Sequence, residues 1–534
     1  MNYNAIKIST SEAESILFNV YNLKGKATEL PGEIDFNFKI KIDNSTSYIL
    51  KISRPNEDLE YIDFQQKLLK YIEKRDSNLT APKVIVDSKG NSISEIIDSF
   101  GKIRKVRLLT WISGRIWSSV NPQLDNLRFS LGSKCGLLTK ALQGFEHPKA
   151  TRNFDWDIAQ SLWTKKHLNL FNSEEKEIVT YFQHKFENNF ESYSKLRKSI
   201  VHNDANDNNI IVSKNLINPK VEAIIDFGDA INTQIINDVA IALYTTINYN
   251  NPLAAALPIV KGYQNSFPLK EAELEHLYTV VAMRLIISIT KSAINKIKEP
   301  DNEYLLISEK PAWEVLKKWH QISPEFAHYS FREACGYISH PKEQEFNNWA
   351  SNQSFKLSEL FPTIQINEVH PVDLSVSSKW IGHQEEFNDL DLFEYKINKL
   401  QKEQPSKIIA GGFLEPRPIY TSKAFDSIGN KGRESRTIHL GVDFWLPNTT
   451  PIHSLFDGEV ITAVNQAGNK LKKQTSTFLI NNGCKKTNNV KKCYNKSHRN
   501  LQSIQKTFLF DGLRFLLQDF FFYQIQKVLL FIII

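Results

Sequence analysis

Cysteine is scarce in this sequence, with four among 534 residues. So few thiols cannot form the framework of a chain this long, which excludes a disulfide-rich fold. Cys135 and Cys335 lie in stretches with apolar periodicity and are expected to be reduced core residues. Cys484 and Cys493 have eight residues between them and no second pair of ligands, so they do not form a zinc knuckle.

Long apolar runs are missing from both ends of the chain. The last run, 528–534, has seven residues and is too short to span a bilayer. Glu12 and Glu14 lie where a signal peptide would have its apolar segment. We therefore expect no membrane span, no export signal and a cytoplasmic location.

An excess of positive charge is missing from the main part of the chain. The net charge is +7, but residues 469–506 contain ten Lys or Arg and no Asp or Glu. Residues 507–534 carry two bases and two acids, so residues 1–468 have a net charge of −3. This balance gives no electrostatic reason to expect a nucleic-acid partner.

Hydrophobic periodicity divides the chain into a β-rich part and a helical part. The first hundred residues alternate short β-type runs with turns and contain one helical pattern, at 57–73. Residues 83–87 and 92–97, with a polar turn between them, predict a hairpin. From about 120 to 360 the pattern is mostly helical, apart from a β-like island at 210–226. The sequence thus predicts an α+β fold.

The chain is longer than one hydrophobic core usually supports, so several domains are expected. The predicted parts are a β-rich N-lobe over 1–112, a helical C-lobe over 113–362, a linker over 363–405, a partial β-rich domain over 406–468, and an irregular basic, then apolar, tail over 469–534.

One segment carries the strongest chemical signal. It contains His202-x-Asp204 followed by Asn209, and Asp226-Phe227-Gly228 begins 17 residues after Asn209. Phosphoryl transfer needs a carboxylate to orient and deprotonate a hydroxyl, and an Asn and an Asp to hold magnesium. A loop with Asp204 and Asn209, beside a hairpin that returns Asp226, meets both needs. The alternative is an Asx-rich turn between strands, and His202 is expected to be structural.

Upstream residues agree with this chemistry. Lys51 lies in an apolar strand and could bind phosphate if an acid on the next helix paired with it; otherwise it is a solvent-facing lysine. Asp63 and Glu60 are the acids on that helix. The turn at 30–38 could cover phosphates. The stretch around Thr110 and Ile112 fits a connection between lobes whose backbone holds a purine, or equally a buried strand that leaves a turn.

Together these segments resemble the aminoglycoside phosphotransferase and choline kinase superfamily, and within it the hydroxylysine-kinase-like branch, over roughly residues 10–360. The matching stretches are Leu30-Pro31-Gly32-Glu33-x-Asp35-x-Asn37-Phe38, Leu50-Lys51-Ile52, Arg107-Leu108-Leu109-Thr110-Trp111, Trp156-Asp157, His202-Asn203-Asp204-Ala205-Asn206-Asp207, Ile225-Asp226-Phe227-Gly228-Asp229, Asn237-Asp238-Val239-Ala240 and Phe331-Arg332-Glu333-Ala334-Cys335-Gly336. The resemblance implies a bilobal protein-kinase-like fold.

The same resemblance implies roles for individual residues. Asp204 would be the catalytic base, Asn209 and Asp226 would hold Mg²⁺, and Lys51 would bind phosphate. Three further groups would complete the nucleotide site: Asp63 as the acidic partner of Lys51, and the backbone of Thr110 and Ile112 around the purine. The family usually has Glu where this chain has Asp63, so Glu60 stays an alternative. Asp229 and Asp207 could attract the amine of a substrate, or be solvated loop acids.

A second resemblance begins after residue 406. His439 and Asp443, in a β-rich context, are similar to the first zinc ligands of an M23 (LytM-type) metallopeptidase domain. The His-x-His that such a site also needs is missing, because only His453 and His498 follow. We therefore expect vestigial ligands, no bound zinc and no peptidase activity. Bacterial fusions join these two domains to a class III aminotransferase, and the likeness stops near Gly468, which predicts a truncated or frameshifted chain.

The sequence predicts a small-molecule kinase that moves the γ-phosphate of ATP or GTP to a hydroxyl, with Mg²⁺ as cofactor. The expected partners are the nucleotide and an amino alcohol of the hydroxylysine, ethanolamine or aminoglycoside kind. The alternatives are a zinc hydrolase at His439 and Asp443, or an inert fragment of a larger fusion enzyme.

Overall fold

The structure is a computed structural model. It describes residues 7–32, 35–76, 79–246, 250–298, 309–352, 354, 356–380, 382, 389–418, 426–429, 432–435, 437–439, 442–447, 450–453, 459–466, 474–481, 504–509 and 532–533. Cys484, Cys493 and Gly468 lie outside these residues. The chain forms two compact units, Met1–Tyr337 and Ile338–Ile534.

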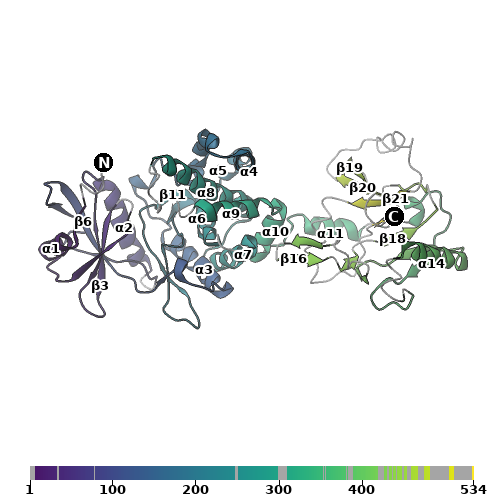
Figure 1. The fold of residues 1–534 in the computed structure, drawn as a ribbon, viewed down its shortest axis with the longest axis horizontal. Helices are drawn as coiled ribbons and strands as arrows, with labels where there is room; N and C mark the ends of the chain where they lie inside the picture. The colour runs from purple at the N-terminus through teal and green to yellow at the C-terminus, as the bar shows by residue number, and fades with distance from the viewer. Residues whose placement is uncertain are drawn as a thin grey trace. The chain divides into compact units, whose positions relative to one another are not determined.

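The first unit begins with an antiparallel sheet in the order β1-β2-β3-β6-β4, with β5 also paired to β6 (Figure 1). Its strands are β1 (Lys26–Leu30), β2 (Phe36–Lys41), β3 (Ser47–Ile52), β4 (Val84–Ile85), β5 (Ser94–Ile97) and β6 (Ile103–Thr110). The register puts Lys51 of β3 opposite Arg107 of β6. The first lobe is therefore β-rich, as predicted.

The predicted hairpin at 83–97 is wrong, because β4 and β5 each pair with β6 and not with each other. The Asp87 carboxylate accepts hydrogen bonds from the backbone N–H groups of Lys89 and Asn91, which closes a tight turn. β4 and β5 leave this turn end to end along the edge of β6 that β3 does not occupy. The backbone groups of both strands thus form their hydrogen bonds with the longer strand β6.

Two helices, not one, belong to this lobe. α1 (Thr10–Tyr21) begins at Ser9, whose side chain accepts from the N–H of Glu12, and it buries Ala13 and Leu17 against the sheet. α2 (Leu59–Arg75) begins at Asp58. The apolar side chains of α2, among them Phe64 and Leu68, belong to the core of the helical lobe. α2 is therefore packed mainly on the second lobe.

The second lobe is mostly helical, as predicted. Its helices are α3 (Asp125–Ala141), α4 (Ser173–Asn188), α5 (Phe190–Ser194), α6 (Ile235–Leu243), α7 (Pro252–Ser266), α8 (Glu271–Lys298), α9 (Glu309–His320) and α10 (Pro324–Ala334), with 3₁₀ segments Trp117–Ser119, Pro148–Ala150, Ile158–Leu170 and Tyr244–Thr246. Cys135 and Cys335 are free thiols and buried.

Glycine allows α3 and α7 to touch through their backbones. A Cβ on Gly132 would lie 1.8 Å from the carbonyl oxygen of Ile259, and one on Gly262 would lie 2.0 Å from that of Phe129. No other residue fits such an approach. Both helices also contact α6, so this close pair helps to hold α6 in place.

α8 is the central helix of the lobe. By length and composition it could cross a membrane, and 83% of its most apolar window is buried inside the fold. Burial of this extent is typical of a core helix, and the packing around it, including Trp319 and Phe331, explains its apolar character.

Two small sheets hold the loops that contain Asp204 and Asp226. β8 (Lys198–Val201) pairs with β11 (Ile231–Gln234), and β9 (Ile210–Val212) pairs with β10 (Val221–Ile224) and β7 (Arg115–Ile116). β9 and β10 are the β-like island expected at 210–226, whereas β7, β8 and β11 were not predicted. The loop 202–209 runs from β8 to β9, and the loop 225–230 runs from β10 to β11.

The second unit contains a sheet in the order β12-β13-β18-β22-β21-β20-β19. Its elements are α11 (Glu343–Ser351), α12 (Leu357–Leu360), β12 (Val369–Val372), α14 (Leu390–Glu403), β13 (Ile408–Gly411), β14 (Glu415–Pro416), β15 (Asp426–Gly429), β16 (Gly432–Ser435), β17 (Ile438–His439), β18 (Val442–Trp445), β19 (Glu459–Gln466), β20 (Gln474–Asn481), β21 (Ile504–Leu509) and β22 (Ile532–Ile533). The predicted linker thus contains β12 and α14, and the described residues of the predicted irregular tail form β20, β21 and β22.

Candidate active site

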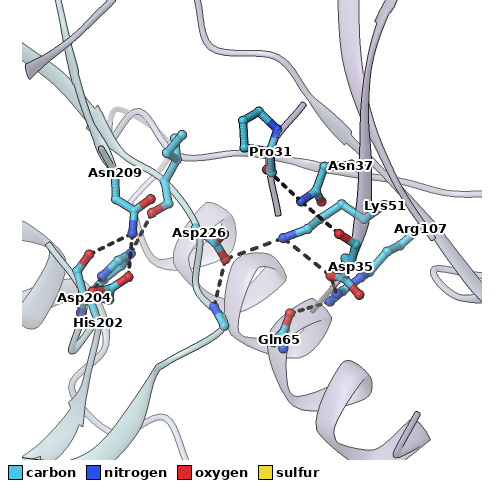
Figure 2. Close-up of polar contacts among 12 residues, drawn as sticks. Pro31, Asp35, Asn37, Lys51, Gln65, Arg107, His202, Asp204, Asn209 and Asp226 are labelled. Atoms are coloured by element: carbon cyan, nitrogen blue, oxygen red, sulfur yellow. Dashed lines mark hydrogen bonds and ion pairs between the residues drawn. The ribbon is translucent and has the colours of Figure 1, made fainter. Parts of the chain in front are cut away.

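Asp204 and Asn209 lie together in the loop between β8 and β9 (Figure 2). The Asn209 amide nitrogen donates to Oδ2 of Asp204 at 2.6 Å, and the Asn206 amide donates to Oδ1 at 2.8 Å. The Asp204 side chain is 21% exposed. The loop therefore presents a fixed carboxylate that solvent or a substrate can still reach.

The loop is anchored by two buried side chains. The Asp238 carboxylate, on α6, accepts the backbone N–H of Asn203 at 3.0 Å, and Asn203 has a φ of 64°. His202 Nδ1 accepts the N–H of Asp204 at 3.2 Å, so its Nε2–H donates to the carbonyl of Ile225 at 3.1 Å. His202 is therefore structural, and it ties Asp204 to the residue before Asp226.

Asp226 reaches toward the first lobe from the other loop. Its φ is 64°, and its Oδ1 accepts the N–H of Gly228 at 3.2 Å and lies 3.5 Å from Lys51 Nζ. Lys51, above all, holds the pKa of this carboxyl below its usual range. Figure 2 shows Asp226 between the Asp204–Asn209 pair and Lys51. The structure therefore brings all four residues into one site.

Neither Asp63 nor Glu60 reaches Lys51, in contrast to the expectation from sequence. Asp63 Oδ2 lies 2.7 Å from Lys67 Nζ and 3.3 Å from His147 Nε2, and Glu60 pairs with Lys149 at 3.1 Å. The turn of α2 that carries both acids faces the second lobe, because α2 packs there.

Asp35 is the acid that accompanies Lys51 in the first lobe. Its Oδ2 lies 3.7 Å from Lys51 Nζ, and it also accepts a hydrogen bond from Arg107, which in turn donates to Gln65 of α2. Asp35 and Arg107 are 8% and 3% exposed. Asp35 comes directly before β2, in the stretch that resembles the kinase family, and that position was the available signal for it.

The lobe connection offers backbone groups to a purine. The N–H of Thr110 donates to the carbonyl of Lys83, and its hydroxyl accepts the N–H of Lys83. The N–H of Trp111 donates to Ser47. The N–H groups of Thr110 and Trp111 are therefore already used, so the predicted purine contact of Thr110 would have to come from its carbonyl.

Acidic groups surround Asp204 and change its ionisation. Burial, and then the nearby Asp229 carboxylate, raise the pKa of Asp204 well above its usual range, whereas Arg284 lowers it. Burial also raises the pKa of Asp207. Asp204 thus lies close to other carboxyl groups, those of Asp229 and Asp226.

The donor set fits a hard divalent cation with few protein ligands. The Asn209 amide gives its nitrogen to Asp204, which leaves its oxygen for a cation, and Asp226 supplies carboxylate oxygen. In the described part of the chain no group of three or more His, Cys, Asp and Glu could enclose a metal. One or two protein oxygens completed by phosphate and water is the usual environment of Mg²⁺.

His439 and Asp443 in the second unit lie together, with a cation already beside them. His439 Nε2 is 3.4 Å from Asp443 Oδ2, and the same oxygen is 2.5 Å from Arg417 Nη1. Arg417 also pairs with Glu415 at 2.6 Å. A guanidinium at this carboxylate opposes the binding of a second cation, so the geometry does not favour zinc.

Two buried groups, His202 and Asp238, are expected to change the stability of the fold with pH in opposite directions. Burial lowers the pKa of His202 to about 4, so proton uptake by the unfolded chain removes stability as pH falls from about 6.5 to 4. Burial raises the pKa of Asp238 to about 6, so proton uptake by the folded chain adds stability as pH falls from about 6 to 4. Each effect amounts to about 3 kcal/mol.

Two variants separate these effects in thermal melts at pH 7, 5.5 and 4. His202→Gln should gain in melting temperature relative to the parent protein as the pH falls, because the parent alone carries the penalty. Asp238→Asn should have a higher melting temperature than the parent protein at pH 7, and this difference should disappear by pH 4. Parallel curves for parent and variant would contradict the burial of the group concerned.

Comparison with known proteins gives one family. The model of the phosphotransferase enzyme family (APH) matches residues 26–272. Hydroxylysine kinase of Mus musculus is 30% identical over 334 residues, which cover 58% of this chain and 88% of the mouse protein. Hydroxylysine kinase of Xenopus laevis is 28% identical over 356 residues, 61% of this chain and 93% of that protein. The solved complex of amicoumacin kinase hAmiN with AMP-PNP and Ca²⁺ is 17% identical, with a TM-score of 0.46, over 60% of this chain and 98% of that one.

Proposed function

The chain belongs to the phosphotransferase enzyme family and is a small-molecule kinase. We propose that it transfers the γ-phosphate of ATP or GTP to the hydroxyl of a small amino-alcohol acceptor. The mouse and Xenopus relatives are hydroxylysine kinases, so acceptors of that kind are the first to test. Ethanolamine-like and aminoglycoside-like acceptors are the alternatives.

The observation that carries the proposal is the meeting of Asp204, Asn209, Asp226 and Lys51 from two lobes. Asp204 would accept the proton of the acceptor hydroxyl while the new O–P bond forms and the bond to the β-phosphate oxygen breaks. Lys51 would bind phosphate oxygens. Asn209 and Asp226 would hold Mg²⁺, which when bound neutralises charge on the phosphates. Because these residues mainly position and neutralise, their fixed hydrogen bonds favour catalysis.

Nucleotide binding is tested by thermal shift of the full chain with ATP or GTP, with and without Mg²⁺. A ligand at a hundredfold excess over its dissociation constant adds about 2.7 kcal/mol to the stability of the folded state. We expect a Mg²⁺-dependent shift with at least one nucleotide. Glu191→Gln, whose side chain is 86% exposed in a surface ion pair, should keep the shift. A folded protein with no shift from either nucleotide would refute the proposal.

A further inference from the structure

Arg284 is a buried cation directed at Asp204 from the core helix α8. Its Nη2 lies 3.8 Å from Oδ1 of Asp204, and its side chain is 7% exposed. Charged side chains are rarely buried without a partner or a function. The position of Arg284 therefore requires an explanation beyond packing.

Aromatic rings hold the guanidinium in place. Its central carbon lies 4.6 Å from the centre of the Trp156 ring and 5.3 Å from that of Tyr244. Nη1 donates to the Ser288 hydroxyl at 2.7 Å. Stacking and one hydrogen bond fix the plane of the group, so it is prearranged for a planar partner.

The guanidinium has more donors than partners. It carries five N–H groups, and Nε, which is buried, has no hydrogen-bond partner among the described residues. The Asp204 oxygen at 3.8 Å is beyond hydrogen-bond distance. Buried polar groups in folded proteins nearly always have partners, and carboxylates are the ones that arginine binds best. The guanidinium thus has a buried donor without a partner, and a ligand carboxylate is the kind of group that would pair with it.

The surrounding charges define which ligand would bring that anion. Asp204, Asp207 and Asp229 favour an ammonium group, as an amino alcohol has, but Arg284 repels it and adds nothing to its binding. A molecule with both an ammonium and a carboxylate uses both signs of charge. An acceptor with only amino and hydroxyl groups has no anion to pair with the guanidinium of Arg284.

We propose that Arg284 binds the carboxylate of the acceptor and so selects a hydroxy amino acid over the corresponding amino alcohol. The proposal rests on the proposed kinase function and narrows its acceptor class. It makes Arg284 a specificity-determining residue, distinct from the residues that would handle phosphate.

Matched acceptors that differ only in the carboxylate test it: 5-hydroxylysine against 1,5-diamino-2-pentanol, and serine against ethanolamine. ADP or GDP release by the full chain gives kcat and KM. The parent protein should prefer the carboxylated member by about tenfold to a hundredfold in kcat/KM. Arg284→Gln should remove that preference, mainly by raising KM for the carboxylated member. Because Arg284 also lowers the pKa of Asp204, its loss would act on both members alike, and the ratio of their kcat/KM values is therefore the measure.

Two further variants keep the result interpretable. Lys296→Gln removes an exposed cation from the same helix and should change neither acceptor. Arg284→Lys keeps a charge at the site and, if Arg284→Gln does not fold, should retain part of the preference. Equal loss for both acceptors would show that Arg284 serves only as a counter-ion of Asp204 and would overturn the proposal, as would a parent protein without preference.

The failure of the kinase assignment is distinguishable from the failure of this inference. Absence of nucleotide binding would refute the assignment itself. If the protein binds nucleotide but shows no turnover, the inference can still be tested by binding. Thermal shifts with lysine and with cadaverine, which lacks the carboxylate, are then compared in the presence of AMP-PNP. Binding of lysine that Arg284→Gln weakens supports the inference, and equal or absent binding of the two contradicts it.

Discussion

Asp226→Asn is expected to lower kcat by about a thousandfold or more and to remove the Mg²⁺-dependent part of nucleotide binding. The reason is that an amide would replace the carboxylate proposed to hold the cation beside Lys51, and charge stabilisation is the largest part of phosphoryl-transfer catalysis. Steady-state product release and thermal shift with and without Mg²⁺ measure the two effects.

Asparagine is the suitable replacement because the backbone restricts the choice. Asp226 has a φ of 64°, a region that Asn tolerates well, and an Asn oxygen can still accept the N–H of Gly228. Lys51 keeps Asp35 at 3.7 Å, so the fold should survive. An Asp226→Asn protein with the parental rate would refute the assigned metal site, whereas an unfolded one would refute the expectation that the fold survives.

Asp204→Asn is expected to lower kcat by about a hundredfold to ten-thousandfold while Mg²⁺–nucleotide binding stays intact, because the lost group acts on the acceptor hydroxyl. Product release over a range of acceptor concentrations, together with the nucleotide-induced thermal shift, separates the two. Glu174→Gln, an exposed carboxyl-to-amide change, is the control. Loss of nucleotide binding in the Asp204 variant would instead assign it a role in holding the metal.

The same variant has an expected effect on stability. The raised pKa of Asp204 means that the folded state disfavours the carboxylate, so its charge reduces stability once the pH exceeds the ordinary value. The uncharged amide removes this cost but loses one of the two hydrogen bonds from Asn206 and Asn209. The melting temperature of the variant, relative to that of the parent, should therefore improve as the pH rises.

The residues of the site could be predicted where the chemistry is local in sequence. Asp204, Asn209 and Asp226 share two loops whose spacing is set by one hairpin, so their residue types and distances along the chain carry the information. Their convergence with Lys51 agrees with that expectation in geometry, and the assigned roles remain predictions.

The partners of Lys51 could not be predicted in this way. Which acid meets it depends on how α2 is rotated against the second lobe, and that rotation is decided by the packing of Phe64 and Leu68 on distant helices. Asp238 belongs to a stretch that matches the family, but its contact with the loop was not predicted, and Arg284 was not singled out at all. The reason is the same, because each lies on an apolar helix whose contact with the loops is long-range. α1, in contrast, had a local signal: a Ser9 cap and apolar residues at helical spacing.

The packing of α2 has a mechanical consequence for the first unit. The sheet has its own apolar core, and α2 shares the core of the helical lobe. The sheet joins that larger core through Leu109, at the end of β6 where the chain crosses between lobes, and through Ile49 and Val84, which lie opposite Leu109 on the neighbouring strands. This end would therefore act as a pivot. Away from it, polar contacts such as Arg107 to Gln65 cross the boundary, and water can replace these at low cost. Tilting of the sheet would therefore carry Lys51 relative to Asp226, with α2 remaining as part of the stationary base.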